Sequence, residues 1–153
     1  MAKVIKIPAD VSQEMEVIDI GNMGWREAAQ SIGADYIEQV RIGDCLNQRG
    51  WDHMRMLVDE TGRLKSLPYN RRGSILYGEP LHGQFIAGDA IIVGELLLNY
   101  EDGPEWVGLD HEGMSGNYGV GDMVSTLITT PEECMDALKV HFEAVHEAVP
   151  AYL

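Results

Sequence analysis

The sequence has few cysteines, few cations in its second half and no long apolar run, and each of these shortages excludes a class of protein. Cys45 and Cys134 are the only cysteines among 153 residues, and they form no CxxC motif. We therefore expect free, buried thiols in a reducing cytoplasm, with neither a disulfide framework nor a thiolate zinc site. No stretch approaches the roughly 20 apolar residues that a membrane-spanning helix needs. Met1–Pro8 predicts a strand that ends at a proline rather than the apolar core of a signal peptide. We expect no membrane segment.

Positive charge is almost absent from the second half of the chain. The formal net charge is −14, from 11 Lys and Arg against 25 Asp and Glu. Residues 1–72 are nearly neutral, whereas residues 73–153 hold 14 carboxylates and one cation, Lys139. Such a field repels nucleic acid and anionic membranes, so we expect neither as a direct partner, and it attracts a basic protein surface, including one built to hold DNA. The alternative is that the charge only keeps the protein in solution.

The remaining composition is that of one soluble globular domain covering residues 1–153, with 45% hydrophobic and 24% charged residues. Apolar patterning predicts strands at 3–7, 15–20, 36–42 and 54–58, with Met54 and Met56 facing inward. Trp25, Ala28, Ala29 and Ile32 recur at helical spacing and predict a short helix over about 23–33. We expect an α+β fold, with a mixed, mostly antiparallel sheet, this short helix and a second helix near the C-terminus.

The C-terminal helix is predicted over about 131–148. Thr130, Pro131 and Glu133 form a typical helix start, with threonine as N-cap and proline in the first helical position. Cys134, Leu138 and Phe142 share one face and predict contact with the core, together with Val145 and Val149. The acidic residues lie largely elsewhere and form our candidate partner-binding surface: Glu132, Glu133, Asp136, Glu143 and Glu147.

The centre of the chain predicts a hairpin and a buried strand. Asp59-Glu60-Thr61-Gly62 separates the apolar run that ends at Val58 from a second run at 64–67, which favours a hairpin turn in which Gly62 takes a positive φ. Gly88-Asp89 predicts a turn into residues 90–93, whose β-branched side chains without polar alternation indicate a strand covered on both faces. Residues 101–122 are rich in glycine and acid and predict an irregular loop, with a short strand at Trp106-Val107.

Asn70, Arg71 and Arg72 form the tightest group of hydrogen-bond donors. Two guanidiniums beside an amide can hold a phosphate or a carboxylate, which makes an anion or nucleotide site beside Trp51 or Tyr69 the alternative function. The competing interpretation is that these arginines pair with the protein's own carboxylates.

No pattern in the sequence points to catalysis, a metal or a cofactor, and we expect none. His141 and His146 are five residues apart, about 140° around a helix, so they cannot share a metal ion as an i, i+4 pair would. The serines lack a nucleophile-elbow context, and neither cysteine has a recognisable base nearby in sequence. We expect a protein that is not an enzyme.

The pattern Asp59-Glu60-x-Gly62, Pro68-x-Asn70-Arg71-Arg72 and Gly88-Asp89 resembles a family of unknown function found in actinobacterial phages, plasmids and their hosts. The resemblance covers residues 3–94 and leaves 95–153 as an acidic extension. It implies a small α+β domain, often encoded by phages, and supplies no catalytic or binding residues. We therefore expect a small non-enzymatic phage or mobile-element protein that binds and modulates a host protein with a basic surface, as an acidic DNA mimic or anti-defence factor. Whether it also forms homo-oligomers stays open.

Overall fold

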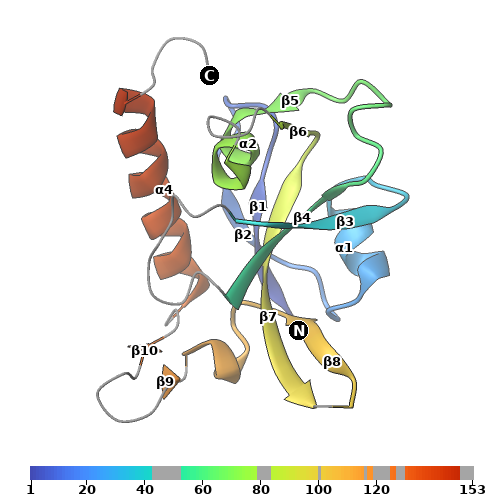
Figure 1. The fold of residues 1–153 in the computed structure, drawn as a ribbon, viewed down its shortest axis with the longest axis vertical. Helices are drawn as coiled ribbons and strands as arrows, with labels where there is room; N and C mark the ends of the chain where they lie inside the picture. Colours follow the sequence, from blue (N-terminus) through green and yellow to red (C-terminus); the bar gives the residue numbers. More distant parts are fainter. Residues whose placement is uncertain are drawn as a thin grey trace.

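A six-stranded antiparallel sheet forms the centre of the molecule. The computed structural model describes residues 1–42, 53–78, 84–99, 101–115, 117–118, 125–126 and 130–148. Five strands follow the order β2-β1-β7-β4-β3, and β8 pairs with β7 beyond the end of β1 (Figure 1). Their bounds are β1 (Lys3–Ile7), β2 (Glu16–Asp19), β3 (Ile37–Arg41), β4 (Met54–Asp59), β7 (Ala90–Asn99) and β8 (Gly103–Val107).

The long strand β7 lies in the middle of this sheet. It pairs with β1 on one side and with β4 on the other, both antiparallel. Ala90, Ile91, Ile92 and Val93 are fully buried, which confirms the prediction of a strand covered on both faces. After Gly94 the strand continues to Asn99 and turns back through Gly103, at φ +73°, into β8. The first part of the glycine-rich segment is therefore a hairpin rather than an irregular loop.

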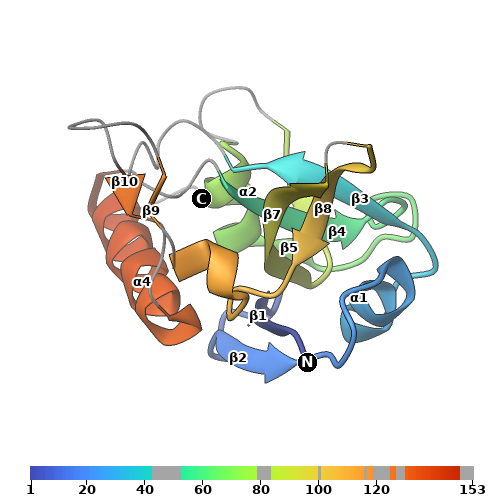
Figure 2. The same cartoon turned by 90° about the horizontal axis from the view of Figure 1, so that it is seen from below.

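Among the described residues, three α-helices cover the two faces of the sheet. Because successive side chains of a strand point to opposite faces, Ile91 and Val93 contact α1 (Trp25–Ser31), whereas Ile92 belongs to the core cluster on the opposite face. That second face carries α2 (Arg71–Tyr77) and α4 (Pro131–Ala148), and Figure 2 shows α4 and α1 on opposite sides of the sheet. The expected α+β class is confirmed. The described part of the chain also contains short elements: β5 (Tyr69–Asn70), β6 (Ile86–Ala87), η3 (Glu112–Ser115), β9 (Asn117–Tyr118) and β10 (Ser125–Thr126).

The hairpin predicted between 54–58 and 64–67 is wrong. β4 pairs with β3 and β7, and residues 60–66 form successive turns with no strand. Asp59 still begins a turn, since its carbonyl accepts from the Gly62 amide at 3.1 Å. Gly62 is required for close packing rather than for a positive φ, because a Cβ there would collide with the carbonyl oxygen of Ala87. A side chain at this position would separate the turn from β6.

Two helix details also differ from expectation. Residues 71–77, for which the sequence pattern predicted no helix, form α2 with Asn70 as its N-cap. In α1 the buried residues are Ala28 and Ala29, whereas Trp25 is 57% exposed. Only the second half of this seven-residue helix packs on the sheet, so the first residue of the predicted apolar face faces solvent. Met54 and Met56 are fully buried, as predicted.

Candidate functional site

The outer face of α4 carries the acidic residues that the sequence singled out. The helix begins as predicted, since the Thr130 hydroxyl accepts the Glu133 amide at 3.1 Å. Cys134 and Leu138 are buried against the sheet, and Phe142 is partly buried beside them. The solvent-facing carboxylates, which we call the acidic face, are Glu132, Glu133, Asp136 and Glu143. The side chain of Glu147, the fifth predicted residue, lies outside the described part of the structure.

The acidic face carries little compensating charge. Lys139 is the one lysine or arginine in α4, and it is exposed. Burial lowers the pKa of His141 below its ordinary value of 6.5, so this imidazole is neutral at pH 7 and adds no positive charge. The exposed Val140 lies among these residues, 66% accessible. The helix therefore presents a surface of net negative charge that includes the apolar side chain of Val140.

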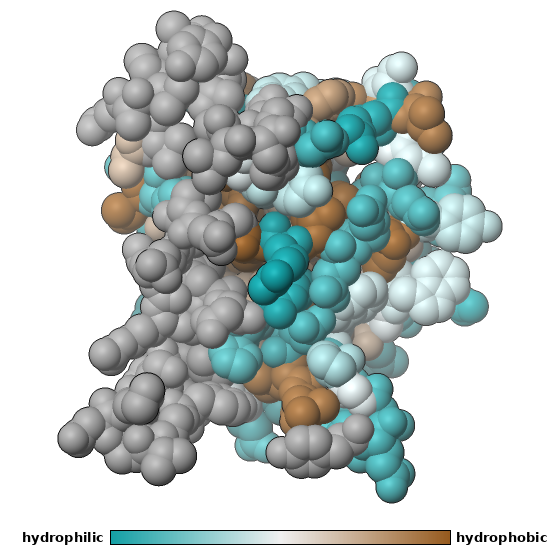
Figure 3. Space-filling view, in the orientation of Figure 1, coloured by the Kyte–Doolittle hydropathy of each residue, from teal (hydrophilic) through white to brown (hydrophobic). Residues whose placement is uncertain are grey.

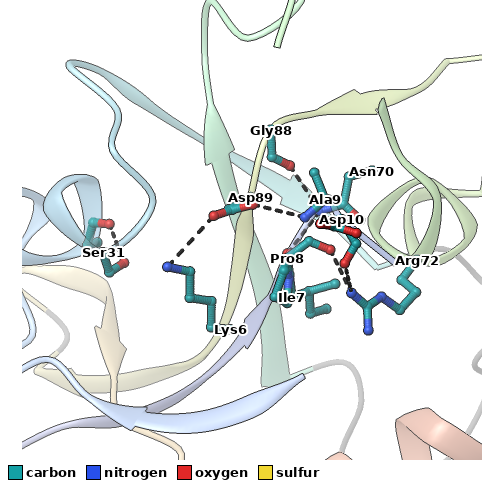
Figure 4. Close-up of polar contacts among 11 residues, drawn as sticks. Lys6, Ile7, Pro8, Ala9, Asp10, Ser31, Asn70, Arg72, Gly88 and Asp89 are labelled. Atoms are coloured by element: carbon teal, nitrogen blue, oxygen red, sulfur yellow. Dashed lines mark hydrogen bonds and ion pairs between the residues drawn. The ribbon is translucent and has the colours of Figure 1, made fainter. Parts of the chain in front are cut away.

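Asn70, the first residue of the predicted anion site, is completely buried. Its Oδ1 accepts the Gly73 amide at 2.8 Å and so caps α2. Its Nδ2 donates to the carbonyls of Ile7 and Gly88, both at 2.9 Å (Figure 4). Each polar atom of the amide thus has a partner within the protein. Asn70 joins the end of β1, the start of α2 and the turn before β7.

Arg72 holds the segment after β1 in the same way. Its Nη2 donates to the carbonyls of Pro8 at 2.8 Å, Asp10 at 3.2 Å and Gln13 at 2.8 Å. Burial lowers the pKa of Arg72, and the carboxylates of Asp10 and Asp89 oppose that effect. The N–H groups of Nη2 are therefore already bonded to these carbonyls. The anion-binding interpretation had assigned them to phosphate oxygens. The described residues therefore support a structural role for Asn70 and Arg72. Arg71 is the first residue of α2, and Trp51 lies outside the described residues.

Asp89 completes this cluster of contacts, which we call the central knot. Its Oδ1 accepts the Ala9 amide at 2.9 Å, and its Oδ2 lies 3.7 Å from Lys6 Nζ (Figure 4). Gly88 precedes it at φ +90°, where any larger side chain would also collide with Leu67. The Asn-x-Arg and Gly-Asp parts of the sequence pattern therefore fasten residues 6–13 to the rest of the domain.

Asp59, the first residue of the pattern, stabilises the turn after β4. Its Oδ1 accepts from the Thr61 amide at 2.9 Å, and its Oδ2 pairs with Lys65 Nζ at 2.6 Å. Burial raises the pKa of Asp59, but hydrogen bonds from Lys65 and Thr61 outweigh it and hold the pKa below its ordinary value. The hydrogen bond to Asp59 raises the pKa of Lys65. The carboxylate is charged at neutral pH and belongs to a paired, structural contact.

The described residues offer little for catalysis or metal binding. Cys134 Sγ is buried 3.4 Å from Met54 Sδ, and burial raises the pKa of this thiol to about 12, so it is protonated and unreactive at neutral pH. Within the described ranges, no three His, Cys, Asp or Glu side chains converge in a way that could hold a metal ion. No helix in the same ranges is long and apolar enough to cross a membrane. Cys45 lies outside them.

The fold and the contacts of the central knot define a small α+β domain in which Asn70, Arg72 and Asp89 make structural contacts. The chain matches the family described as Domain of unknown function (DUF3846) over residues 2–112. Because the match covers well over half of the sequence, the protein belongs to this family. The match extends past the predicted limit at residue 94 to include β8, and it ends before α4. The acidic face therefore lies outside the family domain.

Other comparisons add little. No curated protein matches the sequence. A solved structure described as that of the small RNA methyltransferase HEN1 is similar to 70% of this chain, with 17% identity and a TM-score of 0.46. The similar part is 14% of that protein's chain.

Proposed function

We propose that the protein is a small non-enzymatic interaction protein that binds a host protein with a basic surface through the acidic face of α4. One observation carries this proposal: Glu132, Glu133, Asp136 and Glu143 are all exposed on the side of α4 away from the core. Charge of one sign on a rigid helix steers and orients a partner of opposite sign. A DNA-binding surface is a partner of that kind, so the protein acts as a DNA mimic or anti-defence factor in this proposal.

The proposed setting is a phage or mobile element acting in the bacterial cytoplasm. It rests on the resemblance of the Asp59–Asp89 pattern to proteins of actinobacterial phages and plasmids. Two further features favour a protein surface over a nucleic acid as the partner. The chain has a formal charge of −14, and the arginine-rich centre of the sequence contributes Arg72 to the central knot.

The test is capture of a partner from a bacterial host lysate with the tagged protein and two charge variants. The first variant, E132Q/E133Q/D136N, removes three carboxylates from the acidic face. The matched control, E101Q/D102N/E105Q, removes three exposed carboxylates from the β7–β8 hairpin. We expect a band that the wild type and the control capture and that the first variant loses. The capture should weaken steeply between low and physiological salt, because exposed charges are screened over about 10 Å at 0.1 M.

Two further measurements make the result decisive. Circular dichroism of the first variant tests whether the helix still forms. This control is needed because Glu132 and Glu133 lie in the first turn of α4, where their negative charge interacts favourably with the helix dipole. Duplex DNA added to the captured complex should release the partner if the acidic face occupies a DNA-binding surface. A captured band that resists salt, or that persists in a folded E132Q/E133Q/D136N variant, contradicts the proposal.

A further inference from the structure

A small hollow lies at one edge of the sheet, away from α4. β3 and the end of β4 form one side, and the last residue of α2 and the start of β6 form the other. Its lining is mixed: apolar and aromatic side chains come from Val40, Val58, Tyr77 and Phe85, and charged ones from Glu38, Asp59, Glu60 and Arg63. Figure 3 shows that the described surface on this view of the molecule is largely hydrophilic, with hydrophobic areas that are small and separate. Because the hollow is small, it suits a single side chain or a small ligand better than a broad interface.

Two glutamates supply negative charge at this hollow. Glu38 lies opposite Val58 in the β3–β4 register, so its side chain starts on the same face of the sheet. Glu60 follows β4 directly, and both glutamates are exposed. Asp59 also lines the hollow, but Lys65 neutralises it through their 2.6 Å ion pair. The charge left to attract a ligand is that of Glu38 and Glu60.

A guanidinium group already lies at the aromatic wall. Arg63 Cζ lies 5.5 Å from the centre of the Phe85 ring, within the range of a cation–π contact. The ring is supported from β5 by Tyr69, with ring centres 5.9 Å apart. One further contact fixes Arg63, the hydrogen bond from its Nη1 to Gln84 Oε1 at 3.0 Å, and this contact is open to solvent. Both contacts are of the exposed kind that contributes little free energy, so a competing cation can displace this side chain.

We infer that the hollow binds a guanidinium group against the Phe85 ring, and that Arg63 covers this ring until a ligand displaces it. The planar guanidinium suits the site better than an ammonium, because it stacks on an aromatic ring and offers a fork of donors to two carboxylates. The ligand is either a free guanidinium compound or an arginine side chain of another protein. This inference does not depend on the acidic face of α4.

The test is an NMR titration that follows the backbone amides of residues 84–87. The probes are agmatine, N-acetylarginine amide and N-acetyllysine amide, added to the wild type and to variants. We expect saturable shifts at these amides with a guanidinium probe. R63Q should bind about five-fold more tightly, because apparent affinity rises when a competing internal state is removed. The matched control R26Q removes an exposed arginine from α1 and should bind like the wild type.

Further variants and probes decide the outcome. F85L keeps an apolar wall but removes the ring, and E38Q removes a carboxylate, so each should weaken binding several-fold. Binding of N-acetylarginine amide without agmatine identifies the ligand as a protein side chain, and binding of both identifies a small compound. The inference is overturned if R63Q binds no more tightly than the wild type. Equal binding of the lysine probe, or shifts confined to α4, overturns it as well.

Discussion

At the scale of single residues, Asn70 connects distant parts of the chain through a side chain that is fully buried. A buried primary amide with three hydrogen bonds connects residues that are 63 and 18 positions apart in the chain. Loss of the amide removes a hydrogen bond from each of two carbonyls and from one backbone amide. Such losses are costly, because an unpaired buried polar atom forfeits its hydration without replacement.

Asn70→Ala should destabilise the protein by about 3 kcal/mol, the sum of several unsatisfied polar groups at about 1 kcal/mol or more each. Urea unfolding followed by circular dichroism measures this effect as a lower midpoint. Asn22→Ala, in the exposed turn before α1, is the control and should change the midpoint little. Equal midpoints for the two variants would show that the central knot is not needed for stability.

At the scale of elements, the turn from Asp59 to Ser66 depends on a buried carboxylate whose pKa lies below its ordinary value. The group therefore stabilises the folded state above its unfolded pKa of about 3.9. That contribution is lost as the pH falls through the lower, folded pKa. The turn should be a point where acid begins to loosen the fold.

Asp59→Asn should lower the free energy of unfolding at pH 7 and flatten its decline below pH 4, since the amide does not titrate. Urea unfolding of the wild type and the variant from pH 2 to pH 7 measures both effects. Asp102→Asn, an exposed residue of the β7–β8 hairpin, should keep the wild-type slope. An Asp59→Asn variant with that same slope would contradict the assignment.

The sequence predicted elements whose signals are local and missed those that depend on distant partners. β7 and α4 were found because their apolar runs and the Thr130 cap identify them directly. The hairpin after β4 was wrong because the partners of β4 are β3 and β7, and nothing in residues 54–67 specifies strands that distant.

α2 was missed because it has only seven residues and begins with Arg-Arg-Gly. Its signal was Asn70, an N-cap residue that we interpreted as an anion ligand. The candidate site shows the same contrast between local and distant signals. Helical periodicity predicted that Asp136 and Glu143 are exposed, but no local pattern predicted the contacts of Arg72 with residues 8–13.

At the scale of the whole molecule, the uneven charge should exclude duplex DNA as a direct ligand. The protein carries a formal charge of −14, and DNA binding draws most of its non-specific affinity from cations that neutralise phosphates. Electrophoretic mobility shift with a random duplex at physiological salt should show no complex at micromolar protein. A complex that weakens with added salt would show that a basic surface outweighs the net charge. The arginine-rich centre of the chain would then be the candidate DNA-binding surface.

The middle strand of the sheet is also late in the chain, and this affects how the protein is made. Ile5 of β1 pairs with Ile92 of β7, 87 residues further on. At a synthesis rate of about 5–20 residues per second, β1 leaves the ribosome about 4–17 s before its inner partner is translated. During that interval β1 lacks the strand that joins it to β4, and pairing over such a distance is slow to form. A fragment that ends before residue 90 therefore contains no complete sheet, and the domain folds only after β7 has been synthesised.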